Sequence, residues 1–234
     1  MPGTLYLIPS TLGPGAVDTI PPATLTVVRR LKHFVVETGK VARAFLKEVE
    51  LNHRLQECTY YELNKRTRPQ DLPALLVPAE DGHDIGLLSD AGAPGVADPG
   101  ANLIRLAHQR GIRVVPLVGP SAILLSVMAS GLNGQSFTFH GYLSPKRPQL
   151  AKDLKRLESD SRKYKQTQLW IEAPYRNQAT IEVAREALSP GTLFCAAVDL
   201  TTETEWIRTA PIGEWAAETG EEIQKRPAMF LLLA

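Results

Sequence analysis

Residues 85–100 read Ile-Gly-Leu-Leu-Ser-Asp-Ala-Gly-Ala-Pro-Gly-Val-Ala-Asp-Pro-Gly, and this stretch decides how the rest of the chain is interpreted. Its first part, 85–88, is apolar enough to predict a short buried strand. Residues 89–100 hold three glycines and two prolines, which helix and strand interiors disfavour, so they predict a tight loop. Apolar side chains then recur at helical spacing over residues 101–110. The unit is therefore predicted to be strand, glycine-rich loop and helix.

In open α/β sheets, ligands bind at such a junction, where a parallel strand ends. Glycines lack a Cβ atom and let a ligand approach the backbone, and Asp90 places a carboxylate at the tip of the strand. The alternative is a structural strand-to-helix turn that holds no ligand. Two glycine turns flanked by Asp90 and Asp98 favour the binding role, although the loop alone leaves both interpretations open.

Length and composition are those of a soluble α/β protein. The 234 residues suffice for one large domain or two smaller ones, and the formal net charge of +1 excludes a generally basic nucleic-acid surface. Cys58 and Cys195 stand apart and the five histidines are scattered, so we expect no disulfide framework and no metal site.

Targeting signals are not evident in the sequence. The residues after Met1 do not form the basic and apolar regions of a secretory signal, and no apolar run approaches the length of a membrane span. We therefore expect a cytoplasmic protein that does not bind membranes.

Strands and helices alternate through the first half, with strands expected at residues 4–8, 34–36, 85–88 and 111–115. This alternation predicts parallel strands joined by right-handed crossovers. A Gly-Pro-Ser turn at residues 119–121 precedes an apolar helix, and Ser121 is placed either to cap that helix or to bind a polar ligand group. We place the domain boundary nearby, giving domains 1–116 and 117–234.

The second half holds further expected strands and one strongly basic segment. Strands are expected at residues 137–142, 169–172, 192–200 and 228–234, with helices between them. Residues 144–165 contain eight Lys or Arg residues against three acids. Such a segment is either a surface that binds phosphates or a solvated helix face, and the sequence leaves both open.

Several common chemistries lack their motifs. The first loop has Gly13 and Gly15 but no third glycine, so a dinucleotide fingerprint is incomplete, although Glu37 lies near the place of a ribose-binding acid. Neither a P-loop nor a G-x-S-x-G nucleophile motif occurs.

Together these segments resemble the ordered motifs of the tetrapyrrole methylase superfamily, the class III S-adenosylmethionine-dependent methyltransferases. They are most similar to its branch of ribosomal RNA small-subunit cytidine 2'-O-methyltransferases, and the similarity covers nearly the whole chain. The motifs are Leu5-Tyr6-Leu7-Ile8-Pro9 with Gly13, residues 89–100, Gly119-Pro120-Ser121-Ala122, Gly141-Tyr142-Leu143, Glu172-Ala173-Pro174-Tyr175-Arg176 and Leu200-Thr201.

The resemblance implies two α/β domains, with a parallel N-terminal sheet, a mixed C-terminal sheet and the cofactor cleft between them. It also implies a homodimer and S-adenosylmethionine as cofactor. The residues that it places around the cofactor are Leu12, Gly13, Asp90, Ala91, Ala93, Ser121, Ala122, Ile171 and Leu200.

Methyl transfer from a sulfonium needs few catalytic side chains, because holding donor and acceptor in line supplies much of the acceleration. An acceptor hydroxyl additionally benefits from a base. Glu37, Asp90 and Glu172 are the candidates, since all three lie at expected strand ends. Glu172 is alternatively a structural partner of Arg176, which we favour.

Two departures from the branch bear on the acceptor. Where the branch has E-D-T-R, this chain has Val36-Glu37-Thr38-Gly39, and where it has E-L-T-K, this chain has Asp199-Leu200-Thr201-Thr202. Each loses a cation. The resemblance predicts a methyltransferase that acts on ribosomal RNA cytidine, and the lost cations keep three alternatives open: a tetrapyrrole acceptor, another small-molecule acceptor, or a cofactor-binding protein without catalysis.

Overall fold

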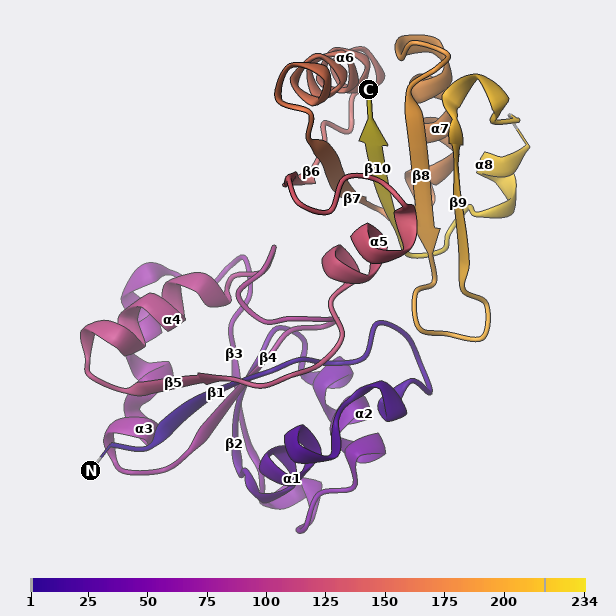
Figure 1. Cartoon of the computed structure of the whole chain (residues 1–234). Helices are drawn as coiled ribbons and strands as arrows, with labels where there is room; N and C mark the ends of the chain where they lie inside the picture. The colour runs from indigo at the N-terminus through magenta and orange to yellow at the C-terminus, as the bar shows by residue number, and fades with distance from the viewer. Residues whose placement is uncertain (1, 217) are drawn as a thin grey trace. The chain divides into compact units, whose positions relative to one another are not determined.

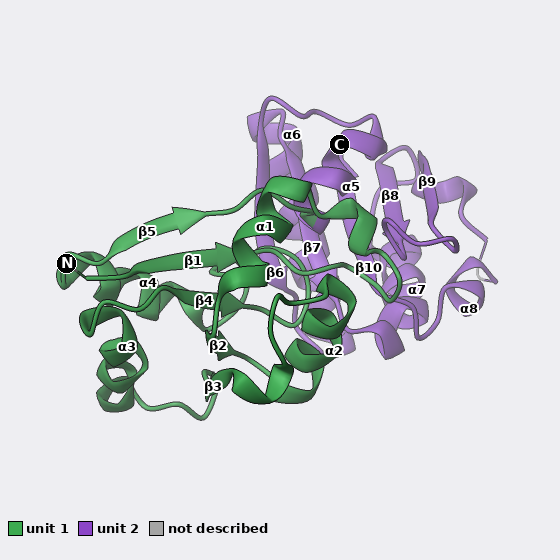
Figure 2. Ribbon diagram, turned by 90° about the horizontal axis from the view of Figure 1, so that it is seen from below, with its two compact units in different colours: residues 1–121 green, residues 122–234 purple. Residues whose placement is uncertain are grey.

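The computed structural model describes residues 2–216 and 218–234. The chain forms two compact units, residues 1–121 and residues 122–234 (Figures 1 and 2). The boundary predicted after residue 116 coincides with the end of a strand, and residues 117–121 group with the first unit.

Unit 1 holds a five-stranded sheet in the order β3-β2-β4-β1-β5, and every neighbouring pair is parallel, which confirms the predicted sheet. The strands are β1 (Thr4–Ile8), β2 (His33–Val36), β3 (Thr59–Glu62), β4 (Ile85–Leu88) and β5 (Arg113–Pro116). The central position of β4 brings the loop that follows it between the loops after β1 and β2.

The helices of unit 1 lie between its strands. The α-helices are α1 (Pro22–Arg30), α2 (Gly39–Val49), α3 (Val77–Glu80) and α4 (Gly100–Gln109), and the 3₁₀ turns are η1 (Val17–Thr19), η2 (Leu55–Glu57) and η3 (Pro69–Leu76). The sequence pattern predicts a helix over residues 71–79 that is interrupted or begun around Pro73, and the structure has η3 followed directly by the short α3 there. Pro73 and Pro78 lack the backbone N–H that a continuous α-helix uses, which explains the break.

Alternate residues of β4 pack into two separate cores. Ile85 and Leu87 join Leu103 of α4 on one face of the sheet, whereas Leu88 joins Ile8 and Phe34 on the other. Gly86 also faces the second core, where a Cβ atom would lie only 2.5 Å from Ile8 Cδ1. Position 86 therefore requires glycine for packing.

Unit 2 holds a five-stranded sheet in the order β6-β7-β10-β8-β9. Only β6 and β7 pair in parallel and the other pairs are antiparallel, so the sheet is mixed, as expected. The strands are β6 (Phe137–Tyr142), β7 (Thr167–Glu172), β8 (Leu193–Val198), β9 (Trp206–Pro211) and β10 (Ala228–Leu233). Trp170, Phe194 and Phe230 pack together in its core, where the rings of Trp170 and Phe230 are stacked.

The helices of unit 2 are α5 (Ala122–Ser130), α6 (Arg147–Tyr164), α7 (Asn177–Ala187) and α8 (Thr219–Glu222), with the 3₁₀ turns η4 (Pro174–Arg176) and η5 (Ile212–Glu214). The helix expected over residues 216–222 corresponds to α8, and residue 217 lies outside the described residues. None of the helices in the described ranges combines the length and the apolar character that crossing a membrane requires.

Gly86→Ala should destabilise unit 1, because the added methyl would meet Ile8, Phe34 and Leu31 within 3.2 Å. Overpacking of this kind costs about 1–3 kcal/mol. The control is Gly191→Ala, where an added Cβ meets nothing within 4 Å. Urea unfolding should show a lower midpoint for the first variant only; equal midpoints would contradict the packing role of Gly86.

Candidate functional site

The loop between β4 and α4 is fixed by its own glycines and by Asp98. Gly92 and Gly95 adopt φ values of +72° and +81°, which L side chains rarely adopt. The Asp98 carboxylate accepts hydrogen bonds from the backbone N–H groups of Gly95 (2.8 Å) and Gly100 (2.7 Å). Burial raises the pKa of Asp98. The Asp98 side chain therefore stabilises the conformation of this loop.

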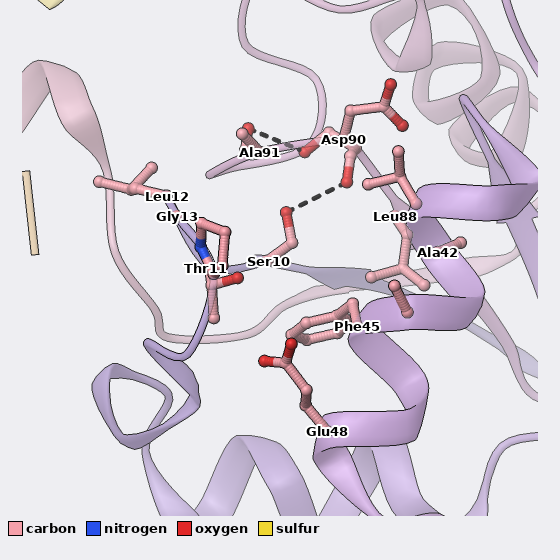
Figure 3. A pocket seen from close by; sticks show the side chains of 14 residues that line it. Ser10, Thr11, Leu12, Gly13, Ala42, Phe45, Glu48, Leu88, Asp90 and Ala91 are labelled. Atoms are coloured by element: carbon pink, nitrogen blue, oxygen red, sulfur yellow. Dashed lines mark hydrogen bonds between the residues drawn. The ribbon is translucent and has the colours of Figure 1, made fainter. Parts of the chain in front are cut away.

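The β4 loop is joined directly to the loop that follows β1. Ser10 N–H donates to Gly92 O at 3.0 Å, and Ser10 Oγ donates to Ser89 O at 3.1 Å. Ser89 Oγ in turn donates to Gly92 O at 3.1 Å. Figure 3 shows the Ser10 side chain directed at the β4 loop. The two loops predicted to bind ligand therefore form one hydrogen-bonded unit.

The segment after β5 packs against the same two loops. A Cβ atom at Gly119 would lie 2.4 Å from Pro9 Cγ, and one at Gly92 would lie 3.9 Å from Pro120 O. Thr24 Oγ1 of α1 donates to Val118 O at 2.7 Å and holds this segment in place. Three loops from separate parts of unit 1 thus meet at the carboxyl end of the sheet.

A pocket of about 270 Å³ opens between the loop after β1, the loop after β4 and α2 (Figure 3). Four residues predicted to bind the cofactor line it together: Leu12, Gly13, Asp90 and Ala91. Ala93 and Ser121, which were predicted with them, belong to the adjoining loops but not to the lining. Glu48 and Asp90 are the charged residues of the described lining, so the pocket is acidic.

The opposite wall of the pocket was not foreseen from the sequence. Phe45 and Glu48 of α2 lie one turn apart and contribute to the lining, with Ala42 beside them (Figure 3). Phe45 belongs to the apolar stripe of α2, which the periodicity assigns to the core. The role of Phe45 and Glu48 in the pocket follows from the position of α2 next to the β1 loop, which the fold shows and the sequence pattern does not.

Asp90 is held by the end of the neighbouring strand β2. Its carboxylate accepts from Thr38 N–H at 3.1 Å and from Thr38 Oγ1 at 2.8 Å. Next to it, burial raises the pKa of Glu37, and the negative charges of Asp90 and Asp98 raise it further. The hydrogen bond from the Asp90 backbone and the charge of Lys65 act in the opposite direction. Glu37 therefore binds a proton more readily than an ordinary glutamate.

Gly39 occupies the place of the arginine in the resembling branch, and a cation nevertheless lies beside it. A Cβ atom at Gly39 would be 3.2 Å from Nη1 of Arg43, one turn further along α2. Arg43 also lies over the ring of Tyr60, 5.7 Å from its centroid. A guanidinium thus lies close to position 39 although the residue there is glycine.

Glu172 is fully engaged by its own surroundings. Its carboxylate pairs with Arg176 Nη1 at 3.3 Å, accepts from Ala173 N–H at 2.8 Å and accepts from Thr180 Oγ1 at 3.0 Å. The side chain has no exposed surface. The predicted pair with Arg176 is confirmed, and the geometry gives Glu172 a structural task rather than that of a base.

The segment that follows β8 contains Leu200 and carries backbone strain. Asp199 and Thr201 have φ values of +48° and +69° although neither is glycine, and Leu200 is buried. Arg226 Nε holds the Asp199 carboxylate at 2.7 Å. Among the described residues, Thr201 Oγ1 is buried without a hydrogen-bond partner, a feature that no sequence pattern announces.

The remaining predicted cofactor residues, Ala122 and Ile171, belong to unit 2. Ala122 begins α5 and Ile171 is the penultimate residue of β7. Neither belongs to the described pocket lining of unit 1. Their role toward the cofactor stays a prediction.

Metal and thiol chemistry find no support in the described part of the chain. It contains no group of three or more His, Cys, Asp or Glu residues placed to hold a metal ion. Cys195 is buried in the sheet of unit 2, and burial raises its pKa to about 11. Cys58 lies 3.7 Å from His53 Nδ1, yet burial raises its pKa too, so both thiols stay protonated near neutral pH.

Comparison with known proteins assigns the family. The sequence model of the tetrapyrrole (corrin/porphyrin) methylases matches residues 4–216. Ribosomal RNA small subunit methyltransferase I from Escherichia coli O157:H7 is 30% identical over 99% of this chain and 77% of that protein. The protein of the same name from Vibrio cholerae serotype O1 is 31% identical over 98% of this chain and 76% of its own.

Solved structures show the same fold. The methyltransferase CobJ superposes with a TM-score of 0.65 at 20% identity, over 99% of this chain and 94% of its own. Uroporphyrin-III C-methyl transferase from Thermus thermophilus, complexed with S-adenyl homocysteine, superposes with a TM-score of 0.55 at 16% identity, over 99% of this chain and 97% of its own. The chain is therefore a methyltransferase that belongs to the tetrapyrrole methylase family, in the branch of the ribosomal RNA small subunit methyltransferases.

Proposed function

We propose that this protein transfers a methyl group from S-adenosylmethionine to ribosomal RNA of the small subunit, with a cytidine 2'-hydroxyl as the acceptor. The names of the relatives, which align with 98–99% of the chain, support the acceptor. The convergence of Leu12, Gly13, Asp90 and Ala91 on one pocket is the observation that carries the proposal for the donor.

The pocket suits the charge of this donor. S-adenosylmethionine supplies a methyl group on a positively charged sulfonium, and since its ammonium and carboxylate groups offset each other, its net charge is positive. Both charged residues of the described lining, Glu48 and Asp90, are acidic, and a cation gains from a carboxylate across a partly desolvated wall. Leu12, Val41 and Phe45 offer apolar surface for the neutral parts of the molecule.

Glu37 is the residue we assign as the base. Of the three carboxylates considered, Glu172 is enclosed by its partners and Asp90 is held by Thr38. Glu37 is half-buried beside Asp90 and has a raised pKa, which brings a carboxylate closer to the value at which a base works best near neutral pH. It would take the proton that the acceptor hydroxyl loses.

The proposal extends to the setting in which the enzyme works. A ribosomal RNA acceptor places the protein in the cytoplasm, and the family resemblance suggests a homodimer. Ser121, Ala122, Ile171 and Leu200 are proposed to complete the surroundings of the cofactor, since Leu200 and Thr201 lie in a strained and partly buried segment.

The acceptor is tested by incubating the protein with labelled S-adenosylmethionine and one of two substrates. We expect label in the RNA of small ribosomal subunits that lack this modification, and none in a porphyrinogen precursor. Label only in the porphyrinogen would show that the acceptor is a tetrapyrrole and not ribosomal RNA. Label in neither, together with calorimetric binding of S-adenosylmethionine, would indicate a protein without catalysis.

Asp90→Lys should lower the affinity for S-adenosylmethionine by about a hundredfold or more, because a cation replaces an acid in the lining of a pocket for a positively charged donor. S-adenosylhomocysteine, which lacks the sulfonium charge, should show a smaller loss. Asp90→Asn, which keeps the shape, should show a smaller loss. Isothermal calorimetry measures both affinities. Asp81→Lys, an equal charge change at an exposed site, is the control. Unchanged affinity in folded Asp90→Lys would mean that the pocket is misassigned.

Glu37→Gln should reduce the rate of methyl transfer by about 10²- to 10⁴-fold while leaving S-adenosylmethionine affinity unchanged, as removal of a base predicts. In the unmodified protein, the rate should fall as the pH drops through the raised pKa of Glu37. Glu62→Gln, at the end of the neighbouring β3, is the control. A variant that keeps the full rate and the same pH profile would exclude Glu37.

The same residue should affect stability with a defined sign. Because the pKa of Glu37 is raised in the folded state, the folded protein binds more protons than the unfolded chain between the two pKa values. The contribution of Glu37 to stability is therefore full below the unfolded pKa and is lost as the pH rises through the folded pKa. In urea titrations, the free energy of unfolding of Glu37→Gln should rise relative to that of the unmodified protein as the pH rises across this window.

A further inference from the structure

Helix α6 presents a one-sided row of cations on its outer face. Leu150, Leu154, Leu157 and Ser161 are buried and define the inner face. Five positively charged residues lie on the opposite face. Their spacing along the sequence keeps them on one side of the helix. This α6 strip consists of Lys152, Lys155, Arg156, Arg162 and Lys163, all exposed.

Two of the three carboxylates of α6 are engaged by groups outside the strip. Glu158 is buried, where it accepts hydrogen bonds from Thr192 Oγ1 and from Ser189 N–H at 2.8 Å. Asp153 accepts from Gln149 Nε2 at 3.0 Å and Ser144 N–H at 3.3 Å.

Most cations of the strip are free to bind a partner. Asp160 pairs with Arg156 at 3.3 Å. Within the described ranges, Lys152, Lys155 and Lys163 form no ion pair. The strip therefore keeps an uncompensated positive charge over about 16 Å, the rise of eleven helical residues.

An exposed aromatic ring stands at the end of the strip. Tyr164 is 56% exposed, and Lys163 Nζ lies 4.8 Å from the centroid of its ring. A ring beside a row of cations is the combination that binds single-stranded nucleic acid, because bases stack on the ring while cations follow the phosphates. Membrane surfaces instead require apolar anchors beside the cations. Tyr164 is the large hydrophobic residue that α6 exposes among the described residues, so a nucleic acid fits better.

We propose that the α6 strip and Tyr164 bind a single-stranded segment of the RNA substrate, with the cations on phosphates and the tyrosine under a base. The inference rests on the proposed RNA acceptor but concerns a surface of unit 2 that is separate from the pocket in unit 1. It also explains how a chain with a net charge of only +1 can bind a polyanion.

The test measures the binding of a fluorescein-labelled, unstructured RNA 12-mer by anisotropy over a series of salt concentrations. In the variant Lys152→Gln/Lys155→Gln/Lys163→Gln, the slope of log K against log salt should fall by about two units, as loss of three phosphate contacts predicts for a single strand. Tyr164→Ala should weaken binding about fivefold or more without changing the slope. An unaltered slope in the first variant would overturn the proposal.

The matched control is Arg105→Gln/Arg113→Gln/Lys225→Gln, which removes the same charge at exposed sites elsewhere. This control should retain the slope of log K against log salt. An equal fall in its slope would mean that only net charge matters, and it would overturn the proposal that the α6 strip binds RNA. Stronger binding of the unmodified protein to phosphatidylserine vesicles than to RNA would also overturn it, in favour of a lipid surface.

Two further measurements separate this inference from the proposed function. The triple variant should bind S-adenosylmethionine normally and methylate small subunits poorly at high salt. If the unmodified protein methylates small subunits while the triple variant keeps the slope of log K against log salt, the proposal that the α6 strip binds RNA is wrong and the proposed ribosomal RNA acceptor is retained. If the strip binds RNA but no methyl is transferred to it, the acceptor is wrong.

Discussion

The hydrogen bonds between Ser10 and the β4 loop are the constraint on which the candidate site depends. They join residues that lie far apart in the sequence, and they use backbone groups that a parallel sheet leaves unpaired at its carboxyl edge. Gly92 O accepts from both Ser10 and Ser89, and the φ of +72° at Gly92, which L side chains rarely adopt, shapes the loop at this junction.

The second constraint is the concentration of negative charge around the end of β2. Glu37, Asp90 and Asp98 lie close enough for their charges to raise the pKa of Glu37. Asp98 is held by backbone N–H donors and Asp90 by Thr38, whereas Glu37 lies half-buried beside them and has a raised pKa. A protein normally avoids such crowding, and its presence beside a pocket is typical of a site that handles protons or cations.

The sequence predicted the strands that line the site because β1 and β4 are short apolar runs, the first followed at once by Pro9 and the second by a loop rich in glycine and proline. It left residues 55–68 open, since β3 is an edge strand without a continuous apolar run. Phe45 could not be assigned to a pocket wall, because periodicity identifies the apolar face of a helix but not what covers it. The unpartnered hydroxyl of Thr201 and the guanidinium of Arg43 beside Gly39 depend on backbone geometry and on side-chain reach, which no spacing rule encodes.

The division of the apolar cores has a consequence for biosynthesis. Both cores of unit 1 are built from residues up to 112, and the core of unit 2 begins only at Leu143. All five parallel strands of the first sheet have thus been translated before the first strand of the second is made. Since domains generally fold as units, N-terminal first, the first sheet can close while the ribosome is still elongating the chain, and the nascent protein need not expose both sets of apolar surfaces at once.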